Sequence, residues 1–311
     1  SPTCELVYKN AKAELCGSTR MGLIKYVMAL MNGARLGIAA QSVGLSQAAY
    51  NEGLAYARDR EQFGKAIIEM PAVYDMLATI KAKLDAGRAL LYHCARAVDI
   101  YKALEDISRE RKLTAEERAE MKAYNKLADS LTPLAKGMNS EYCNQNTYDA
   151  LQIHGGSGFM MDYPIQRYAR DARITSIYEG TTQLQVVAAI RFVMNGAYLS
   201  HLRELEQQEV SAEMKELQVR AAKMADAFEV AVERVKAAGV QEYQDLCARH
   251  LVEMAADTLM LHLLTYNATH APELFSKSAR VYARYAAAEV EKHLVFVNEL
   301  SPEDLEAYRQ V

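Results

Sequence analysis

Long runs of residues at helical spacing, interrupted at only a few glycine and proline residues, constrain the fold of this chain most strongly. The 311 residues contain only 6 prolines, and helix-forming residues such as Ala, Leu, Glu and Lys predominate. Helices are predicted over residues 21 to about 56, 71 to about 104, and about 115 to 154. A short turn of helix is expected from Pro164, and a fourth long helix from Gly180 to about Gly196. The sequence therefore predicts an all-α fold built on an antiparallel four-helix bundle.

The boundaries of these helices carry recognisable signals. Thr114-Ala115-Glu116-Glu117 is a capping box, in which the threonine and the second glutamate satisfy each other's backbone N–H groups. Pro71 suits the first position of a helix, since proline has no N–H to leave unsatisfied there. Gly64 and Gly155 are stop signals for the helices that precede them.

The sequence patterns at the two ends of the chain differ from that of the bundle, which is predicted over residues 19–199. Residues 200–311 are predicted to form a second helical domain, with boundaries at Gly239, Pro272 and Ser301-Pro302. Cys4-Glu5-Leu6-Val7-Tyr8 alternates polar and apolar residues, as a strand does. One strand has no pairing partner, so residues 1–18 are interpreted as the remnant of a β-domain, and the chain as a fragment of a longer protein.

Composition excludes several classes of function. A net charge of −4 provides no basic field for nucleic acid, and no apolar run is long enough for a membrane span. The cysteines are odd in number and scattered, so each is expected to be a buried free thiol in a reducing, cytoplasmic environment: Cys4, Cys16, Cys94, Cys143 and Cys247. Neither they nor the histidines have the spacing of metal ligands, and no metal site is predicted.

The clearest chemical signal is a carboxylate, Glu179, directly before Gly180 in a basic and polar stretch over residues 167–183. Because glycine has no side chain, a ligand could approach this carboxylate closely. A carboxylate beside the ring of Tyr178 in a poorly hydrated pocket gains the proton affinity that a general base needs. Thr181 and Gln183 add hydrogen-bonding groups. The alternative interpretation is a glutamate placed at a helix start by the helix dipole.

Two further motifs accompany this stretch. Residues 56–67 read Tyr-Ala-Arg-Asp-Arg-Glu-Gln-Phe-Gly-Lys-Ala-Ile, and residues 152–159 read Gln-Ile-His-Gly-Gly-Ser-Gly-Phe. The glycine-rich motif is not a phosphate-binding P-loop, and it follows a helix rather than the strand of a dinucleotide-binding turn. In this order, and together with Asn32–Ala40, the motifs resemble the C-terminal helical domain of the acyl-CoA dehydrogenase family over residues 20–197. The segments 105–122 and 200–311 resemble the long branch of that family.

The resemblance implies FAD-dependent α,β-dehydrogenation of an acyl-CoA. Glu179 matches the family's catalytic base, which removes the α-proton while the β-hydrogen leaves as hydride to FAD. Arg35 matches an arginine close to that carboxylate. Further matches to substrate-binding positions are Asn32, Gly33, Ala34, Tyr178 and Gly180.

The resemblance also assigns FAD contacts. Arg60, with a guanidinium suited to phosphate oxygens, matches a pyrophosphate contact. In the family, the loop that residues 152–156 match typically contacts the FAD of a neighbouring subunit. The remaining matches to cofactor contacts are Gln62, Phe63, Gln152, Ile153, His154, Gly155, Gly156, Thr181 and Gln183. Glu179 is expected to face a cleft shared by residues 35, 60 and 152.

Three departures from the family pattern stand beside these expectations. The family often has a polar residue near Met70-Pro71, and an arginine is common where this chain has Val186. The family's N-terminal helical and middle β-domains are absent, so the isolated chain is expected to be inactive. The resemblance implies an electron-transfer flavoprotein as acceptor and a homodimer or homotetramer. An acyl-CoA oxidase, a non-catalytic scaffold and a plain oligomerisation module remain as alternatives.

Overall fold

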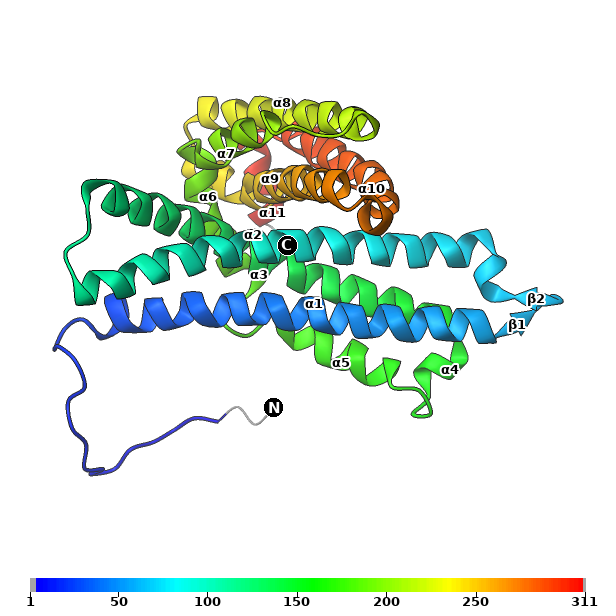
Figure 1. The fold of residues 1–311 in the computed structure, drawn as a ribbon, viewed down its shortest axis with the longest axis horizontal. Helices are drawn as coiled ribbons and strands as arrows, with labels where there is room; N and C mark the ends of the chain where they lie inside the picture. The colour runs from blue at the N-terminus through cyan, green and yellow to red at the C-terminus, as the bar shows by residue number, and fades with distance from the viewer. Residues whose placement is uncertain (1–3, 310–311) are drawn as a thin grey trace.

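The computed structural model describes residues 4–309, apart from the side chains of residues 23–25, 28 and 29, and most of the chain is helical (Figure 1). The long helices of the bundle are α1 (Met28–Asp59), which follows a π-helical segment (Gly22–Val27), α2 (Pro71–Glu110) and α3 (Ala115–His154). Tyr56 stacks on His154 while Asn32 bonds to Asp129, so α1 and α3 run in the same direction, with α2 opposed to both. The predicted helical bundle is confirmed.

The fourth arm of the bundle is two helices rather than one. α5 (Ile165–Thr175) follows the short α4 (Gly156–Phe159), and α6 (Thr182–Met194) follows a loop over residues 176–181. Both run antiparallel to α3: Asn144 bonds to the carbonyl of Ala172 in α5, and Thr182 in α6 bonds to Glu141. The predicted short turn from Pro164 is in fact a helix of 11 residues, and the helix after Gly180 is 13 residues long.

The helix boundaries follow most of the sequence signals, but α2 ends at Glu110 rather than near residue 104, and Gly64 has a different role from the one expected. Thr114 and Glu117 form the predicted capping box, and α3 ends at Gly155 with φ 58°. Gly64, expected only to stop α1, lies in a hairpin of β1 (Glu61–Gln62) and β2 (Lys65–Ala66). Phe63 and Gly64 both adopt positive φ angles, which a tight turn between paired strands requires. A 3-10 turn (Ile67–Glu69) joins the hairpin to α2.

The C-terminal part forms a second set of helices beside the bundle (Figure 1). It comprises α7 (Ala197–Glu206), α8 (Lys215–Ala238), α9 (Gln241–His270), α10 (Pro272–Glu299) and α11 (Leu305–Arg309), with 3-10 turns at Ala212–Met214 and Pro302–Asp304. The predicted starts after Gly239 and at Pro272 and Ser301 are confirmed.

The two sets of helices share one apolar core, which includes Leu90 on α2, Leu251 on α9 and Ala283 on α10. A buried polar cluster also joins them. Asp257 on α9 accepts hydrogen bonds from Tyr142 on α3 at 2.6 Å and from Tyr282 on α10 at 2.9 Å. Burial raises the pKa of Asp257 to about 6, and the tyrosine donors oppose this rise. The division at residue 199 stays a prediction.

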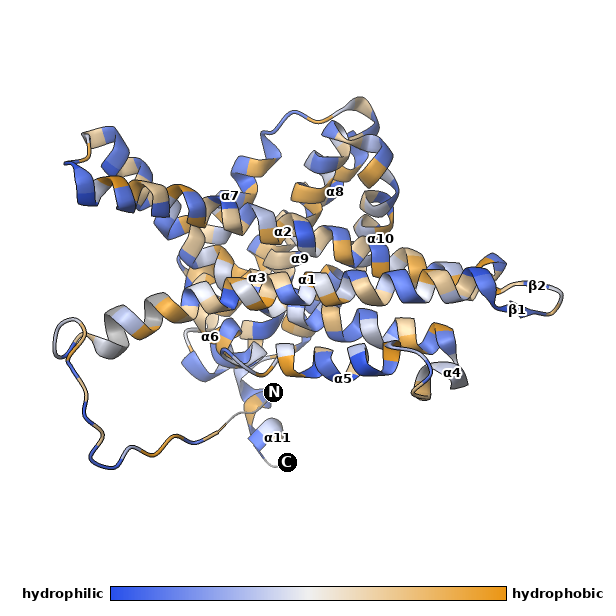
Figure 2. Ribbon diagram, turned by 60° about the horizontal axis from the view of Figure 1, so that its bottom comes forward, coloured by the Kyte–Doolittle hydropathy of each residue, from blue (hydrophilic) through white to orange (hydrophobic). Residues whose placement is uncertain are grey.

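The N-terminal segment does not contain the predicted strand. Residues 4–20 are exposed, and the chain leaves the helices as a long loop (Figure 2). Within residues 4–309 the strands are β1 and β2, which pair with each other, so none pairs with Cys4–Tyr8, and an unpaired strand is not stable. Residues 1–3 of the predicted β-domain remnant lie outside the described residues.

The expectation of buried thiols is wrong for Cys4 and Cys16, which are exposed, and confirmed for Cys94, Cys143 and Cys247. Within residues 4–309, no helix is both long and apolar enough to cross a membrane.

The shared core leads to a prediction about cooperativity. Leu251→Ala removes a fully buried side chain from the C-terminal part and should cost about 2–5 kcal/mol of stability. Because the core is continuous, we expect a single calorimetric transition that moves to lower temperature as a whole. Two transitions, of which only one moves, would contradict a common core.

Candidate active-site loop and a separate groove

The loop between α5 and α6 has an unusual backbone. Glu179 has φ 55° and Gly180 has φ 93°. For a residue with a Cβ atom, the left-handed region costs about 1–2 kcal/mol, so surrounding contacts must stabilise this conformation. Glu179 is half-buried.

Hydrogen bonds from α3 and α6 fix this loop. The carbonyl oxygen of Gly180 accepts from Lys136 Nζ at 2.7 Å and from Gln185 Nε2 at 3.0 Å. The backbone N–H of Thr182 donates to Ser176 O at 3.1 Å, which closes the loop on itself. Thr181, predicted to contact the flavin, caps α6 by accepting from the N–H of Leu184 at 3.3 Å.

Positive charge lies beside Glu179. Arg35 Nη2 lies 3.7 Å from the point where a Cβ atom on Gly180 would be, so the predicted catalytic pair is brought together. Burial lowers the pKa of Arg35, and the charge of Glu179 opposes this shift. Arg35 Nη1 also donates to Asn32 Oδ1 at 3.3 Å. Among the described residues, the Glu179 carboxylate has no hydrogen-bond or ion-pair partner, so its oxygens are available to a ligand.

The other predicted substrate positions surround this loop. The hydroxyl of Tyr178 donates to Gln41 Oε1 on α1. Gly33 is exposed, and a Cβ atom there would meet nothing within 4 Å. Ala34 is half-buried and Gln183 is exposed.

A separate groove of about 360 Å³ lies at the far end of α1 and α3. It brings together the two motifs that the sequence singled out, and its lining residues are Tyr56, Arg60, Gln62, Ile67, Ile153, His154, Gly155, Gly156 and Ser157. A small apolar cluster that includes Ala57, Ile80 and Ile165 supports this end of the bundle. Four of the predicted cofactor residues do not line the groove. Gln152 is exposed and Phe63 is 93% exposed, while Thr181 and Gln183 belong to the Glu179 loop and the start of α6.

One wall of the groove contains a buried histidine with an unpartnered nitrogen. His154 Nδ1 lies 2.7 Å from the carbonyl of Ala150 and donates to it, so Nε2 is left as an acceptor without a partner. Tyr56 stacks on the imidazole with ring centroids 4.3 Å apart, and burial lowers the pKa of His154. A ribose hydroxyl could donate to Nε2, while the Arg60 guanidinium and the glycine backbone suit a phosphate. The groove therefore fits the nucleotide end of a cofactor such as FAD.

The groove and the Glu179 loop do not form one cleft in this chain. Arg35 and Arg60 are separated by 25 residues (60 − 35) of a continuous helix, which is roughly 37 Å at about 1.5 Å per residue. No side chain spans that distance. The expectation that residues 35, 60 and 152 share a cleft is therefore wrong for a single chain.

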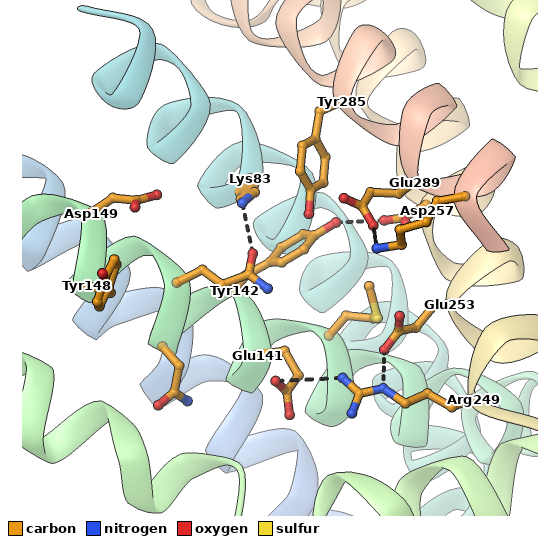
Figure 3. Close-up of a pocket in the computed structure, with 14 residues that line it drawn as sticks. Lys83, Glu141, Tyr142, Tyr148, Asp149, Arg249, Glu253, Asp257, Tyr285 and Glu289 are labelled. Atoms are coloured by element: carbon orange, nitrogen blue, oxygen red, sulfur yellow. Dashed lines mark hydrogen bonds and ion pairs between the residues drawn. The ribbon is translucent and has the colours of Figure 1, made fainter. Parts of the chain in front are cut away.

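The sequence interpretation missed a cavity of about 640 Å³ between α2, α3, α9 and α10 (Figure 3). Charged and tyrosine side chains line it, and Arg249 lies there between Glu141, at 3.9 Å, and Glu253, at 2.7 Å. Glu141 also accepts from Thr182 at 2.5 Å, at the start of α6. No sequence signal could have found this cavity, because its residues come from four helices and become neighbours only on folding.

The interpretation also missed Lys136 and Gln185, which bind the Gly180 carbonyl. A signal for Lys136 was present, since a lysine within an apolar stretch of a helix is unusual. Val186, where the family commonly has arginine, is buried in the core.

Comparison with known proteins places both parts of the chain in one family. Residues 36–183 match the family model described as "Acyl-CoA dehydrogenase, C-terminal domain", and residues 194–305 match that described as "Acyl-CoA dehydrogenase C terminal". An acyl-CoA dehydrogenase of Bacillus subtilis is 34% identical over 199 residues, which cover 63% of this chain and 46% of the relative. A 3-(aryl)acrylate reductase of Clostridium sporogenes is 34% identical over 187 residues, which cover 59% of this chain and 43% of the relative.

The fold agrees with these matches. The crystal structure of an acyl-CoA dehydrogenase complexed with FAD from Bacillus anthracis superimposes with a TM-score of 0.70 at 21% identity, over 87% of this chain and 49% of that one. The chain spans less than half the length of the curated relatives named above. With both of its halves matched to the same family, this chain belongs to the acyl-CoA dehydrogenases.

Proposed function

We propose that this chain forms the C-terminal part of an enzyme that catalyses α,β-dehydrogenation of an acyl-CoA thioester. The relatives named as acyl-CoA dehydrogenases and acrylate reductases support this class of reaction. In the proposed mechanism Glu179 removes the α-proton of the bound thioester. Bound FAD supplies the acceptor for the β-hydrogen, which leaves as hydride.

The observation that carries the proposal is the environment of Glu179. Its carboxylate is half-buried, lacks a partner among the described residues and stands beside Arg35. A general base must have a free oxygen within reach of the proton that it removes. The absence of a side chain at Gly180 leaves room for the thioester, and the exposed Gly33 on α1 offers a surface along which an acyl-CoA could lie.

We further propose that FAD binds between two copies of the chain. The groove around Arg60 and His154 suits its nucleotide end, yet lies roughly 37 Å along α1 from Arg35. A homodimer in which the groove of one copy faces the Glu179 loop of the other would bring the two parts together. Large exposed side chains near the groove favour association: Phe63, Phe159 and Met161 are each more than 80% exposed.

The acceptor of the electrons follows from the same comparison. A relative from Acetobacterium woodii, 37% identical over 158 residues, is named as a subunit of a caffeyl-CoA reductase–Etf complex. We therefore propose an electron-transfer flavoprotein as partner and place the reaction in the cytoplasm. Oxygen consumption during turnover would instead identify an acyl-CoA oxidase, which needs the same base.

The role of Glu179 can be tested in a protein of the relatives' full length that contains this chain. Glu179→Gln keeps the shape of the side chain but removes its basic oxygen, so we expect dehydrogenation to fall by about 10²–10⁴-fold while FAD stays bound. Flavin bleaching by acyl-CoAs of varied length measures the reaction. The control is Glu120→Gln, an exposed glutamate of α3, which should leave the rate unchanged. Full activity in Glu179→Gln would remove this residue from the mechanism.

A second prediction concerns the 311-residue chain alone. Its groove offers contacts to one end of FAD only, so we expect weak or no flavin binding after purification. The visible absorbance of the purified protein measures this. A stoichiometric yellow flavin on the chain would show that the contacts this chain offers suffice for FAD binding.

A further inference from the structure

The backbone of the Glu179 loop accepts a hydrogen bond from a buried lysine, Lys136, to which the proposed function gives no role. We propose that Lys136 is a positioning residue, whose ammonium holds the Gly180 carbonyl and thereby fixes the direction in which the Glu179 side chain leaves the loop. The inference rests on the proposed function for its catalytic consequence. The effect of Lys136 on the conformation of the loop can be tested on the chain itself.

The burial of Lys136 is the first observation. Its side chain is 0% exposed, although lysine is almost never fully buried without a partner for its charge. Among the described residues, Lys136 forms no ion pair, and its hydrogen bond to the Gly180 carbonyl, at 2.7 Å, is the contact that satisfies the ammonium. Desolvating a charge is costly, so a lysine at this place is expected to have a specific role.

The direction of that hydrogen bond is the second observation. The Gly180 carbonyl accepts from both Lys136 and Gln185, and two donors on one oxygen fix the orientation of the peptide plane after Gly180. This plane directly follows Glu179 and Gly180, whose φ angles are both positive. Without these two donors the Gly180 carbonyl would keep no hydrogen bond among the described residues, so the peptide plane could rotate and the glutamate could return to a commoner conformation.

The surrounding charges agree with a role at this loop. The pKa of Lys136 is lowered to about 8, mainly by burial; Glu141 on α3 and Glu179 in the loop oppose this shift, and Arg35 on α1 adds to it. The lysine is therefore protonated at neutral pH. A charged donor makes a stronger hydrogen bond than the neutral amide of Gln185 does.

Hydrogen exchange on the 311-residue chain tests the proposal without any cofactor. The backbone N–H groups of Thr182, Leu184 and Gln185 are all hydrogen-bonded to the loop and report on its opening. In Lys136→Met, which keeps most of the apolar stem but loses the ammonium, we expect these amides to exchange about tenfold faster or more. Mass spectrometry of peptides spanning residues 176–186 measures the rates.

The matched control is Lys83→Met. Lys83 is another buried lysine, 7% exposed, but its ammonium donates to Gln145 and lies over the ring of Tyr285, away from the loop. Its replacement should leave the exchange of residues 176–186 unchanged. Equal exchange in Lys136→Met and the wild type would overturn the proposal, as would equal acceleration in both lysine variants, since that indicates general loosening.

A second variant keeps the proposal testable should Lys136→Met fail to fold. Gln185→Leu removes the other, uncharged donor to Gly180 and should accelerate the same amides by a smaller factor, about twofold to fivefold. No acceleration in this variant would show that the Gly180 carbonyl does not control the loop.

The kinetics of the longer protein separate this inference from the proposed function. Lys136→Met should lower kcat with little change in KM or flavin content, because the base is displaced while the binding surfaces remain. If Glu179→Gln is fully active and Lys136→Met still loosens the loop, the proposed mechanism fails and the positioning role stands. If Glu179→Gln is inactive and Lys136→Met leaves the loop unchanged, the proposed mechanism stands and the positioning role of Lys136 fails.

Discussion

The burial of α3 is the constraint on which the rest of this structure depends. This helix packs against α1, α2, α5, α6 and α9, and a different part of it serves each region of the molecule. Lys136 reaches the Glu179 loop, Tyr142 reaches the buried aspartate of the C-terminal helices, and His154 forms a wall of the groove. Because these residues are on one rigid helix, the distances between the three regions are fixed by the helical rise.

The rigidity of these helices also explains why the proposed site cannot be complete in one copy. α1 carries Arg35 near its start and ends beside Arg60, and a straight helix cannot bring its two ends together. The groove around Arg60 and the Glu179 loop, which the proposed function joins in one site, lie roughly 37 Å apart along α1. A second copy in the opposite orientation is the economical way to join such halves, because closed two-fold symmetry generates two equivalent sites at once.

Buried polar groups concentrate where helices from different parts of the chain meet. Asp257, Tyr142 and Tyr282 satisfy one another inside the shared core, whereas Lys136 satisfies a backbone carbonyl at the edge of a loop. In the core, such groups fix how the helices are packed. At the loop, the same physics stabilises a backbone conformation that its own residues would not adopt. Glu141, which lines the charged cavity and accepts from Thr182, connects these two environments.

The sequence by itself determined the helices and most of their ends, because capping boxes, glycines and prolines act through contacts within a few residues. Thr114, Gly155 and Pro272 needed no tertiary information. It also singled out both motifs that line the groove and the loop with Glu179. Only the tertiary structure decided that Cys4–Tyr8 forms no strand, since a strand exists only when another strand pairs with it. Likewise, only the tertiary structure separated residue 35 from residue 60 and placed Lys136 against Gly180, because those relations depend on which helix faces which, and no local pattern encodes them.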